Sequence, residues 1–168
     1  IWTRPEAVIK SFGDLLAYKN PPITQLLNEV DQFASLLSNV CDKIQTVLVP
    51  TWTLPPYIRG FGMLDMKKDM GMANVLMQMN LRLSEKISGS SNIYLLDVQK
   101  WISAAGKYAY DPRLWYRGKI VFGNAVYKEA VKDIKSALAG IQGHSKKLII
   151  LDLDNTLWGG VVGDLGWE

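Results

Sequence analysis

The sequence has few cysteines and no long hydrophobic run. Cys41 is the single cysteine, so the chain cannot form an internal disulfide or a cysteine-based metal site. Nothing in it argues for secretion, and we expect a reducing, cytoplasmic setting. The longest apolar stretch of interest, residues 148–151, is far shorter than the roughly 20 residues that a membrane span needs. We therefore expect no membrane association.

The excess of one charge sign over the other is also small. The chain has 19 basic and 16 acidic residues, a formal net charge of +3, and no Lys/Arg tract of the nucleic-acid-binding type. We expect no nucleic-acid partner. Hydrophobic residues make up 48% of the 168 residues, which allows a buried core and excludes a disordered tail. The first five residues lack the basic and apolar pattern of a signal peptide. They also include no Met, so we expect upstream residues to be missing.

Hydrophobic periodicity predicts helices that alternate with short strands. Apolar residues at helical spacing predict helices over 6–18, 23–44, 72–87, 98–105 and 124–141. Short apolar runs predict buried parallel strands at 46–49 and 93–97. Strands that alternate with helices imply a parallel sheet with right-handed crossovers, and hence an α/β domain over 1–145. Because two strands are few for such a domain, we expect an upstream strand or two to be absent.

An aromatic and basic segment, 108–122, precedes the last of these helices and is predicted to be a loop. Its Tyr and Trp residues are interspersed with Arg113, Arg117 and Lys119. The segment is either a packed cover for a sheet edge, which we favour, or a binding surface. Opposite charge steers a partner toward a binding surface, so an acidic partner would suit these three cations.

A chemically specific motif follows the short hinge-like segment Gly143-His144-Ser145. The apolar run 148–151, the start of a predicted strand over 148–153, leads into Asp152, Asp154 and Thr156, and then into two glycines. Side chains two apart in a strand point to the same side, so the two carboxylates lie close together at the strand end. Two such anions repel unless a cation lies between them or one is protonated. Mg²⁺ prefers carboxylate and carbonyl oxygens, and the pattern predicts that Asp152 and Asp154 are its ligands.

This arrangement suits phosphoryl transfer. Asp152 would attack phosphorus and form an aspartyl-phosphate. Asp154 would protonate the leaving oxygen and then activate the incoming nucleophile. Mg²⁺ would screen the like charges of carboxylate and phosphate, and Thr156 would support the turn by hydrogen bonding back to the loop. The alternative is a strand-terminal Asx turn without chemistry.

Residues 151–164, LDLDNTLWGGVVGD, resemble the first motif of haloacid dehalogenase (HAD) superfamily phosphatases, and more narrowly that of the FkbH-like branch, subfamily IIIC. The segments VPTW at 49–52, MN at 79–80 and DPRLW at 111–115 are similar to loops of the SGNH-hydrolase-like domain of that branch. The resemblance implies a three-layer (αβα) parallel-sheet domain, SGNH-like or flavodoxin-like, over 1–145. The first strand and catalytic loop of a Rossmann-like HAD domain would follow at 146–168.

The resemblance also implies a Mg²⁺-dependent phosphatase that acts on a phosphorylated small molecule. By position, Asp152 is the nucleophile and a metal ligand, and Asp154 is the acid/base with its main-chain carbonyl on the metal. Some FkbH-like proteins dephosphorylate 1,3-bisphosphoglycerate and load the glyceryl group onto an acyl carrier protein. An acidic acyl carrier protein is then the expected partner for Arg113, Arg117 and Lys119.

Parts of the family pattern are absent. The Ser/Thr, Lys and acidic pair that complete a HAD site lie downstream in the family, so we expect these 168 residues alone to be inactive and their parent protein to be active. The predicted strand 148–153 lacks the rest of its domain, so we expect that the chain can dimerise through this tail.

Two alternative functions remain: a non-catalytic carrier-docking module and an SGNH-type esterase. The esterase would need an upstream Ser and His144, because Asp111 lacks the His of the Asp-x-x-His pattern.

Overall fold

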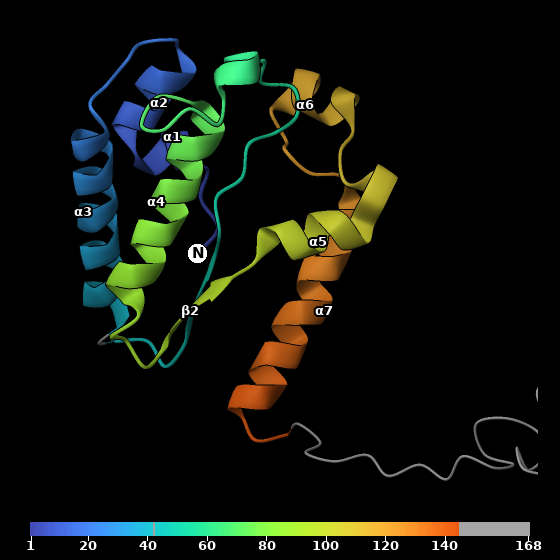
Figure 1. Ribbon diagram of the computed structural model, residues 1–168. Coiled ribbons are helices and arrows are strands. Elements are labelled where there is room, and N and C mark those ends of the chain that lie inside the picture. Colours follow the sequence, from blue (N-terminus) through green and yellow to red (C-terminus); the bar gives the residue numbers. More distant parts are fainter. Residues whose placement is uncertain (42, 145–168) are drawn as a thin grey trace, which may run out of the picture. The chain divides into compact units, whose positions relative to one another are not determined.

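The computed structural model describes residues 1–41 and 43–144 (Figure 1). The expected strand 148–153, the motif residues Asp152, Asp154 and Thr156, and the expected second domain at 146–168 lie outside the described residues. Residues 1–130 form one compact unit, and a second unit begins at Val131. In chain order the elements are α1 (Pro5–Val8), α2 (Lys10–Leu16), α3 (Ile23–Cys41), β1 (Val47–Pro50), the 3-10 turn η1 (Gly62–Leu64), α4 (Met72–Ile87), β2 (Ile93–Leu96), α5 (Val98–Ala105), η2 (Gly106–Tyr108), α6 (Pro112–Gly118) and α7 (Asn124–Ile141).

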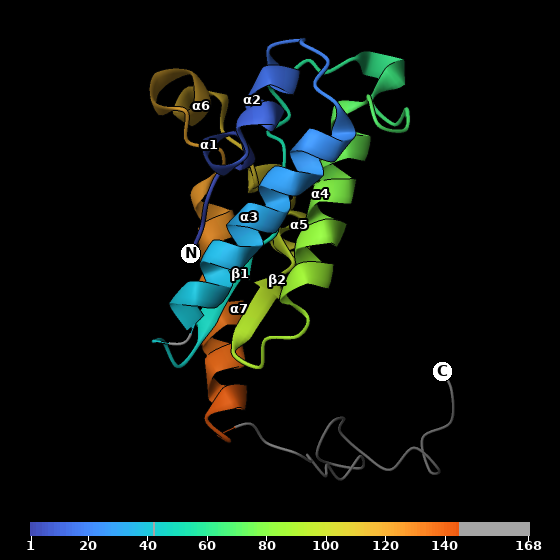
Figure 2. The same cartoon turned by 90° about the vertical axis from the view of Figure 1, so that its left-hand side faces the viewer.

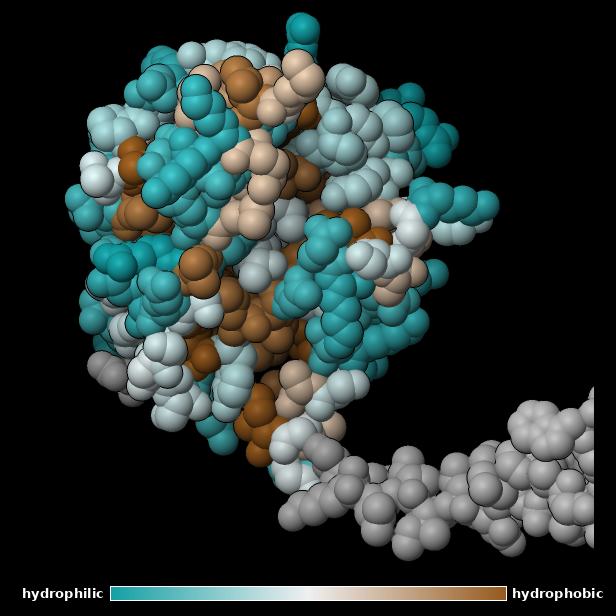
Figure 3. Space-filling model, in the orientation of Figure 1, coloured by the Kyte–Doolittle hydropathy of each residue, from teal (hydrophilic) through white to brown (hydrophobic). Residues whose placement is uncertain are grey.

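The two predicted strands form a parallel pair. β1 and β2 are joined in register from Val47 opposite Ile93 to Pro50 opposite Leu96. The helices α3 and α4 lie side by side on one face of this sheet (Figure 2). Within the described residues β2 is an edge strand, and Figure 3 shows hydrophobic residues gathered around it. The α/β class is therefore as predicted, with a small parallel sheet among many helices.

The core is built from amphipathic helices. In α4 the buried residues recur every three or four positions, as its predicted helical face requires: Met72, Val75, Leu76, Met79, Leu83 and Ile87. They pack with buried side chains of α2, α3 and β1 in one cluster. Burial of each such side chain contributes about 1.5–3 kcal/mol. None of the described helices is long and apolar enough to cross a membrane.

The first predicted helix is divided, which corrects the expectation of one helix over 6–18. Ile9 adopts an extended conformation (φ −117°, ψ 97°) between α1 and α2, and its side chain is fully buried. The backbone N–H of Ile9 still donates to the carbonyl of Pro5, at 2.8 Å. A single helix over this span cannot be assumed from periodicity, because burial of Ile9 is compatible with either conformation.

The aromatic and basic segment contains a helix, which corrects the expectation of a loop over 108–122. The carboxylate of Asp111 accepts a hydrogen bond from the Arg113 backbone N–H at 2.9 Å, and Pro112 occupies the first turn of α6. Lys119 closes the helix in the left-handed conformation (φ 53°, ψ 29°). An acidic N-cap followed by Pro is a helix-start signal. The abundance of aromatic residues obscured this signal in the sequence.

Two further expectations need correction at helix boundaries. The helix predicted over 23–44 ends at Cys41, and Ile44 lies beyond it with 44% of its surface exposed. In α7 the helical spacing predicted that Tyr127, Ala130 and Val131 face inward. Ala130 is buried, whereas Tyr127 and Val131 are 38% and 50% exposed, and Val126 is buried instead.

Candidate functional site

The carboxyl ends of β1 and β2 lie at one edge of the sheet because the strands are parallel. Thr51 joins the two exits. Its backbone N–H donates to the carbonyl of Leu96 at 2.8 Å, and its hydroxyl accepts from the backbone N–H of Val98 at 3.1 Å. Ligand sites of α/β proteins form outside the carboxyl ends of the strands. This edge is therefore the candidate site within the described residues.

One pocket at this edge has a volume of about 330 Å³. Its lining residues come from both strand exits, α4 and the segment before α6: Thr51, Trp52, Thr53, Leu54, Leu76, Met77, Asn80, Asp97, Gln99 and Tyr110. The Asn80 amide and the Asp97 carboxylate have structural partners, since Asn80 bonds the Trp52 backbone and Asp97 accepts from the Gln99 backbone N–H at 2.9 Å. Burial raises the pKa of Tyr110, which keeps its phenol protonated at neutral pH.

A second pocket, of about 350 Å³, shares Thr51 and Thr53 with the first. The residues that line it come from the N-terminal segment, the exit of β1 and the segment after α6: Trp2, Thr3, Arg4, Pro5, Thr51, Thr53, Lys119, Ile120, Val121, Phe122 and Tyr127. Three aromatic rings of this set contact one another, with centroid separations of 5.7 Å for Trp2–Phe122, 5.4 Å for Trp2–Tyr127 and 6.2 Å for Phe122–Tyr127. This pocket therefore combines cations with an aromatic wall.

The three predicted partner-binding cations lie at two places. Arg113 and Arg117 line the same open depression beside α6, of about 410 Å³. Arg113 forms an ion pair with Asp111 at 3.0 Å, and this hydrogen bond holds the pKa of the Asp111 carboxyl below its usual range. Lys119 instead lines the second pocket described above, the one with three aromatic rings in its wall. Its ammonium lies 5.0 Å from the centroid of the Trp115 ring.

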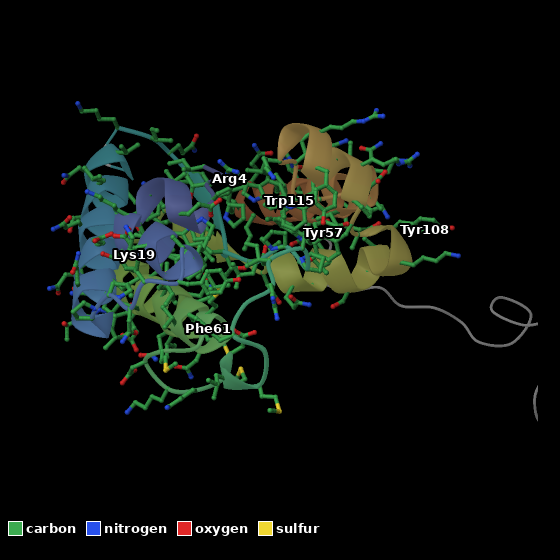
Figure 4. All side chains as sticks on the ribbon, turned by 90° about the horizontal axis from the view of Figure 1, so that it is seen from above. Arg4, Lys19, Tyr57, Phe61, Tyr108 and Trp115 are labelled. Carbon is green, nitrogen blue, oxygen red and sulfur yellow. The ribbon has the colours of Figure 1, made fainter. Side chains whose placement is uncertain are left out.

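The aromatic residues of α6 pack on the loop that follows β1. The ring of Tyr57 stacks on Trp115 with centroids 6.0 Å apart and contacts Tyr116 at 5.9 Å. Figure 4 shows Tyr57 beside Trp115, whereas Tyr108 points away from the body of the chain. Burial, and then the charge of Asp111, raise the pKa of Tyr57. One side of the segment thus covers another loop, and the exposed Tyr108 and Tyr116 remain on its surface.

The loop between β1 and α4 folds around Asp65. The Asp65 carboxylate accepts a hydrogen bond from the Phe61 backbone N–H at 2.7 Å. Gly60 has a left-handed φ of 64°, and a Cβ at this position would overlap an oxygen of that carboxylate. The left-handed φ favours glycine at position 60, and a Cβ there would push the Asp65 carboxylate away from its present place. The position of this loop after a parallel strand makes Phe61 and Asp65 site candidates from the sequence, but the hydrogen bond between them could not be predicted.

The predicted metal ligands cannot be placed by this geometry. Asp152, Asp154 and Thr156 lie outside the described residues, and among the described ones no cluster of three or more His, Cys, Asp and Glu side chains is suited to a metal ion. His144, which an esterase would need, follows α7, where its backbone N–H donates to the carbonyl of Ala139 at 2.8 Å.

Comparisons with known proteins give one informative likeness. No protein-family model matches the sequence. No curated protein matches it either. A solved structure, the N-terminal part of a Bacteroides fragilis protein that contains a phosphatase domain and is complexed with Mg, is similar with a TM-score of 0.66 and 25% sequence identity. The match covers 95% of this chain and 42% of that chain, so this chain spans less than half the length of the matched structure.

Proposed function

We propose that this chain is part of a Mg²⁺-dependent phosphatase of the HAD type. The observation that carries the proposal is the sequence pattern in which the apolar run 148–151 leads into Asp152-x-Asp154-x-Thr156. The likeness to a Mg-complexed structure that contains a phosphatase domain supports it. An isolated structural turn does not explain why two carboxylates directly follow so hydrophobic a run of residues.

The donor chemistry fits the metal. Asp152 and Asp154 offer hard oxygen ligands two positions apart, and Mg²⁺ binds through one or two carboxylates together with phosphate oxygens and waters. When bound, the ion supplies positive charge that offsets the repulsion between the attacking carboxylate and the phosphate. Thr156 supports the turn that holds the two carboxylates.

The chain's own residues carry the two half-reactions. An oxygen of Asp152 forms a bond to phosphorus while the bond from phosphorus to the leaving oxygen breaks, and that oxygen takes a proton from Asp154. Asp154 then accepts a proton from the incoming water, whose oxygen bonds to phosphorus. The acyl-phosphate bond breaks in this second step, which frees inorganic phosphate and restores the Asp152 carboxylate.

The finer proposal is an FkbH-like enzyme with an SGNH-like domain over 1–145. The Leu-Trp-Gly-Gly continuation at 157–160 supports the branch, and the parallel β1–β2 pair between helices is compatible with the domain. The substrate would then be an acyl phosphate such as 1,3-bisphosphoglycerate. If the acceptor were an acyl carrier thiol, the acyl carbon would form a bond to sulfur and the phosphate would leave.

Phosphate release by the whole protein that contains this chain tests the proposal. We expect Asp152→Asn and Asp154→Asn each to abolish Mg²⁺-dependent phosphate release from a small phosphate ester. Asp164→Asn is the matched control, because it removes a carboxylate of the same region that has no assigned role in the reaction. Chelation with EDTA should stop the reaction and added Mg²⁺ should restore it. Full phosphate release by Asp152→Asn would contradict the assigned nucleophile.

A carrier-docking role is the second candidate, and it rests on the cations of α6. Arg113 and Arg117 are exposed and line one depression, which suits an acidic partner. In an NMR titration with an acyl carrier protein we expect shifts around α6 and weaker binding for Arg113→Glu and Arg117→Glu. Lys128→Glu, an exposed cation on α7, is the control. No shift at Arg113, Arg117 or Lys119 would exclude this role.

A further inference from the structure

The pocket shared by the N-terminal segment and the segment after α6 has features of a ligand site that the phosphoryl-transfer motif does not use. We call it the aromatic pocket, and its defining residues are Trp2, Arg4, Thr53, Lys119, Phe122 and Tyr127. Its volume of about 350 Å³ lies within the range of small-molecule sites. Its position next to Thr51 places it at the carboxyl edge of the parallel strands.

The charge of the aromatic pocket is positive. The ammonium of Lys119 has no carboxylate partner among the described residues, and the Trp115 ring lies beside it. Arg4 has a single contact with Glu6 at 3.5 Å, between two partly exposed side chains, and such pairs bind weakly. Of the described residues that line this pocket, none is Asp or Glu. An anion entering it would meet two cations, of which only Arg4 has a carboxylate partner, the weakly paired Glu6.

The backbone holds Lys119 at this place. Lys119 has a left-handed conformation, which is unusual for a residue with a long side chain. The Lys119 N–H donates to the Trp115 carbonyl at 2.9 Å, so the conformation also closes α6. Strained backbone of this kind is enriched at ligand sites, because the surrounding structure must stabilise it. The strain fixes the point from which this cation reaches the pocket.

Aromatic rings and a threonine hydroxyl line the rest of the aromatic pocket and would select which anions bind there. Trp2, Phe122 and Tyr127 form an aromatic cluster, and Trp2 keeps 41% of its surface exposed toward solvent. The hydroxyl of Thr53 has no hydrogen-bond partner among the described residues and can donate to a ligand. Flat apolar groups pack well on such rings.

We propose that the aromatic pocket binds a small organic anion with a flat apolar body. The anionic group would pair with Lys119 and Arg4 and accept a hydrogen bond from Thr53. The apolar body would pack against Trp2, Phe122 and Tyr127. This site takes its ligand independently of Asp152 and Asp154, so it goes beyond the phosphatase proposal.

A titration of the 168-residue chain with phenylphosphonate, followed by ¹H–¹⁵N NMR, tests the proposal. This probe has an anionic head and an aromatic body, and its P–C bond resists hydrolysis. We expect saturable shifts at residues 2–4, 51–53 and 119–123. Arg4→Gln and Lys119→Asn should each raise the Kd about tenfold, since each removes a charge-assisted hydrogen bond. Asn tolerates the left-handed backbone, so Lys119→Asn preserves the end of α6.

Lys107→Gln is the matched control. Its ammonium also lies 5.0 Å from an aromatic centroid, that of Tyr108, but Lys107 does not line the aromatic pocket. This variant should keep the wild-type Kd. Phenol, the neutral aromatic probe, and inorganic phosphate, the anion without a body, should both bind at least about tenfold more weakly than phenylphosphonate.

Three outcomes would overturn the proposal. They are shifts confined to residues outside the aromatic pocket, a Kd that Arg4→Gln and Lys119→Asn leave unchanged, and equal binding of inorganic phosphate. Asp152→Asn separates this proposal from the phosphatase proposal. It should abolish phosphate release by the whole protein and leave the phenylphosphonate Kd of the aromatic pocket unchanged.

Discussion

The side-chain amide of Asn80 forms a reciprocal pair with the backbone of Trp52. Its Oδ1 accepts from the Trp52 N–H at 2.8 Å, and its Nδ2 donates to the Trp52 carbonyl at 2.9 Å. The pair links α4 to the exit of β1, where the buried Trp52 ring packs against Phe33. Two segments that the family resemblance singled out independently, 49–52 and 79–80, therefore meet in space.

Loss of this pair should destabilise the fold. Asn80→Ala leaves the N–H and carbonyl of Trp52 without partners, which we expect to lower the free energy of unfolding by about 1–3 kcal/mol. Urea denaturation monitored by circular dichroism would measure the change. Met77→Ala is the control, because Met77 lies on the same helix with 58% of its surface exposed, and we expect it to change stability by at most about 0.5 kcal/mol. Equal effects of the two variants would contradict this role for Asn80.

The two faces of α4 allow a matched comparison between leucines. Leu83 is fully buried, whereas Leu81, two positions earlier, is 63% exposed. Leu83→Ala creates a cavity in the core and should lower the free energy of unfolding by about 2–5 kcal/mol. Leu81→Ala should stay within about 0.5 kcal/mol of wild type. Thermal and urea unfolding would decide, and a larger loss for Leu81→Ala would show that the helix is rotated relative to its assigned core face.

Gly71 is required by a close approach rather than by its backbone angles. A Cβ at Gly71 would overlap the carbonyl oxygen of Asp65, although φ at this position is −68°. We expect Gly71→Ala to lower stability by about 1–3 kcal/mol, because backbone must move to admit the methyl group. Gly89→Ala is the control, since no atom lies within 4 Å of the point that a Cβ would occupy there. Similar melting temperatures for the two variants would contradict the close packing of the Asp65 loop.

The ion pairs between α3 and α4 predict a dependence of stability on acid. Asp31 accepts two hydrogen bonds from Arg82, each at 2.8 Å, and contacts Lys86 at 3.1 Å. The hydrogen bonds from Arg82, and then from Lys86, lower the pKa of Asp31 below its ordinary value of 3.8. Because the pKa of Asp31 is lower in the folded chain than in the unfolded chain, its carboxylate stabilises the fold at pH values above the unfolded-state pKa. This contribution is lost as the pH falls through the folded-state pKa.

Asp31→Asn should therefore be less stable than wild type at pH 7, and the difference should shrink as the pH falls below about 4. Urea midpoints for both proteins between pH 7 and pH 2.5 would measure this convergence. Arg82→Gln should show the same convergence because it removes the first partner of the carboxylate. A difference that stays constant down to pH 2.5 would show that the variant acts through packing and not through charge.

Much of the fold could be predicted from hydrophobic periodicity. The helices α4, α5 and α7 and both strands lie where the apolar pattern places them, since a repeat of three to four residues is characteristic of one buried helix face. The break at Ile9 could not be predicted in this way, because an extended residue can also be buried. The start of α6 was predictable in principle from the Asp111 cap and Pro112.

The candidate site was less accessible to sequence reasoning. The motif at Asp152 and Asp154 is local in the chain, so spacing alone indicates its chemistry. The aromatic pocket joins Arg4 to Lys119, which are more than a hundred positions apart, and no local pattern connects them. Arg113, Arg117 and Lys119 looked like one cationic group in sequence, but the left-handed turn at Lys119 places it in a different pocket from the other two.

The loop around Asp65 binds an anionic group of its own, the Asp65 carboxylate. The glycines at positions 60 and 62 both have left-handed φ angles, and the Phe61 N–H between them binds a carboxylate of the same loop. A free phosphate would have to displace an anion whose effective concentration is set by a tether of four residues. Gly60 thus makes room for an anionic group that the loop itself supplies.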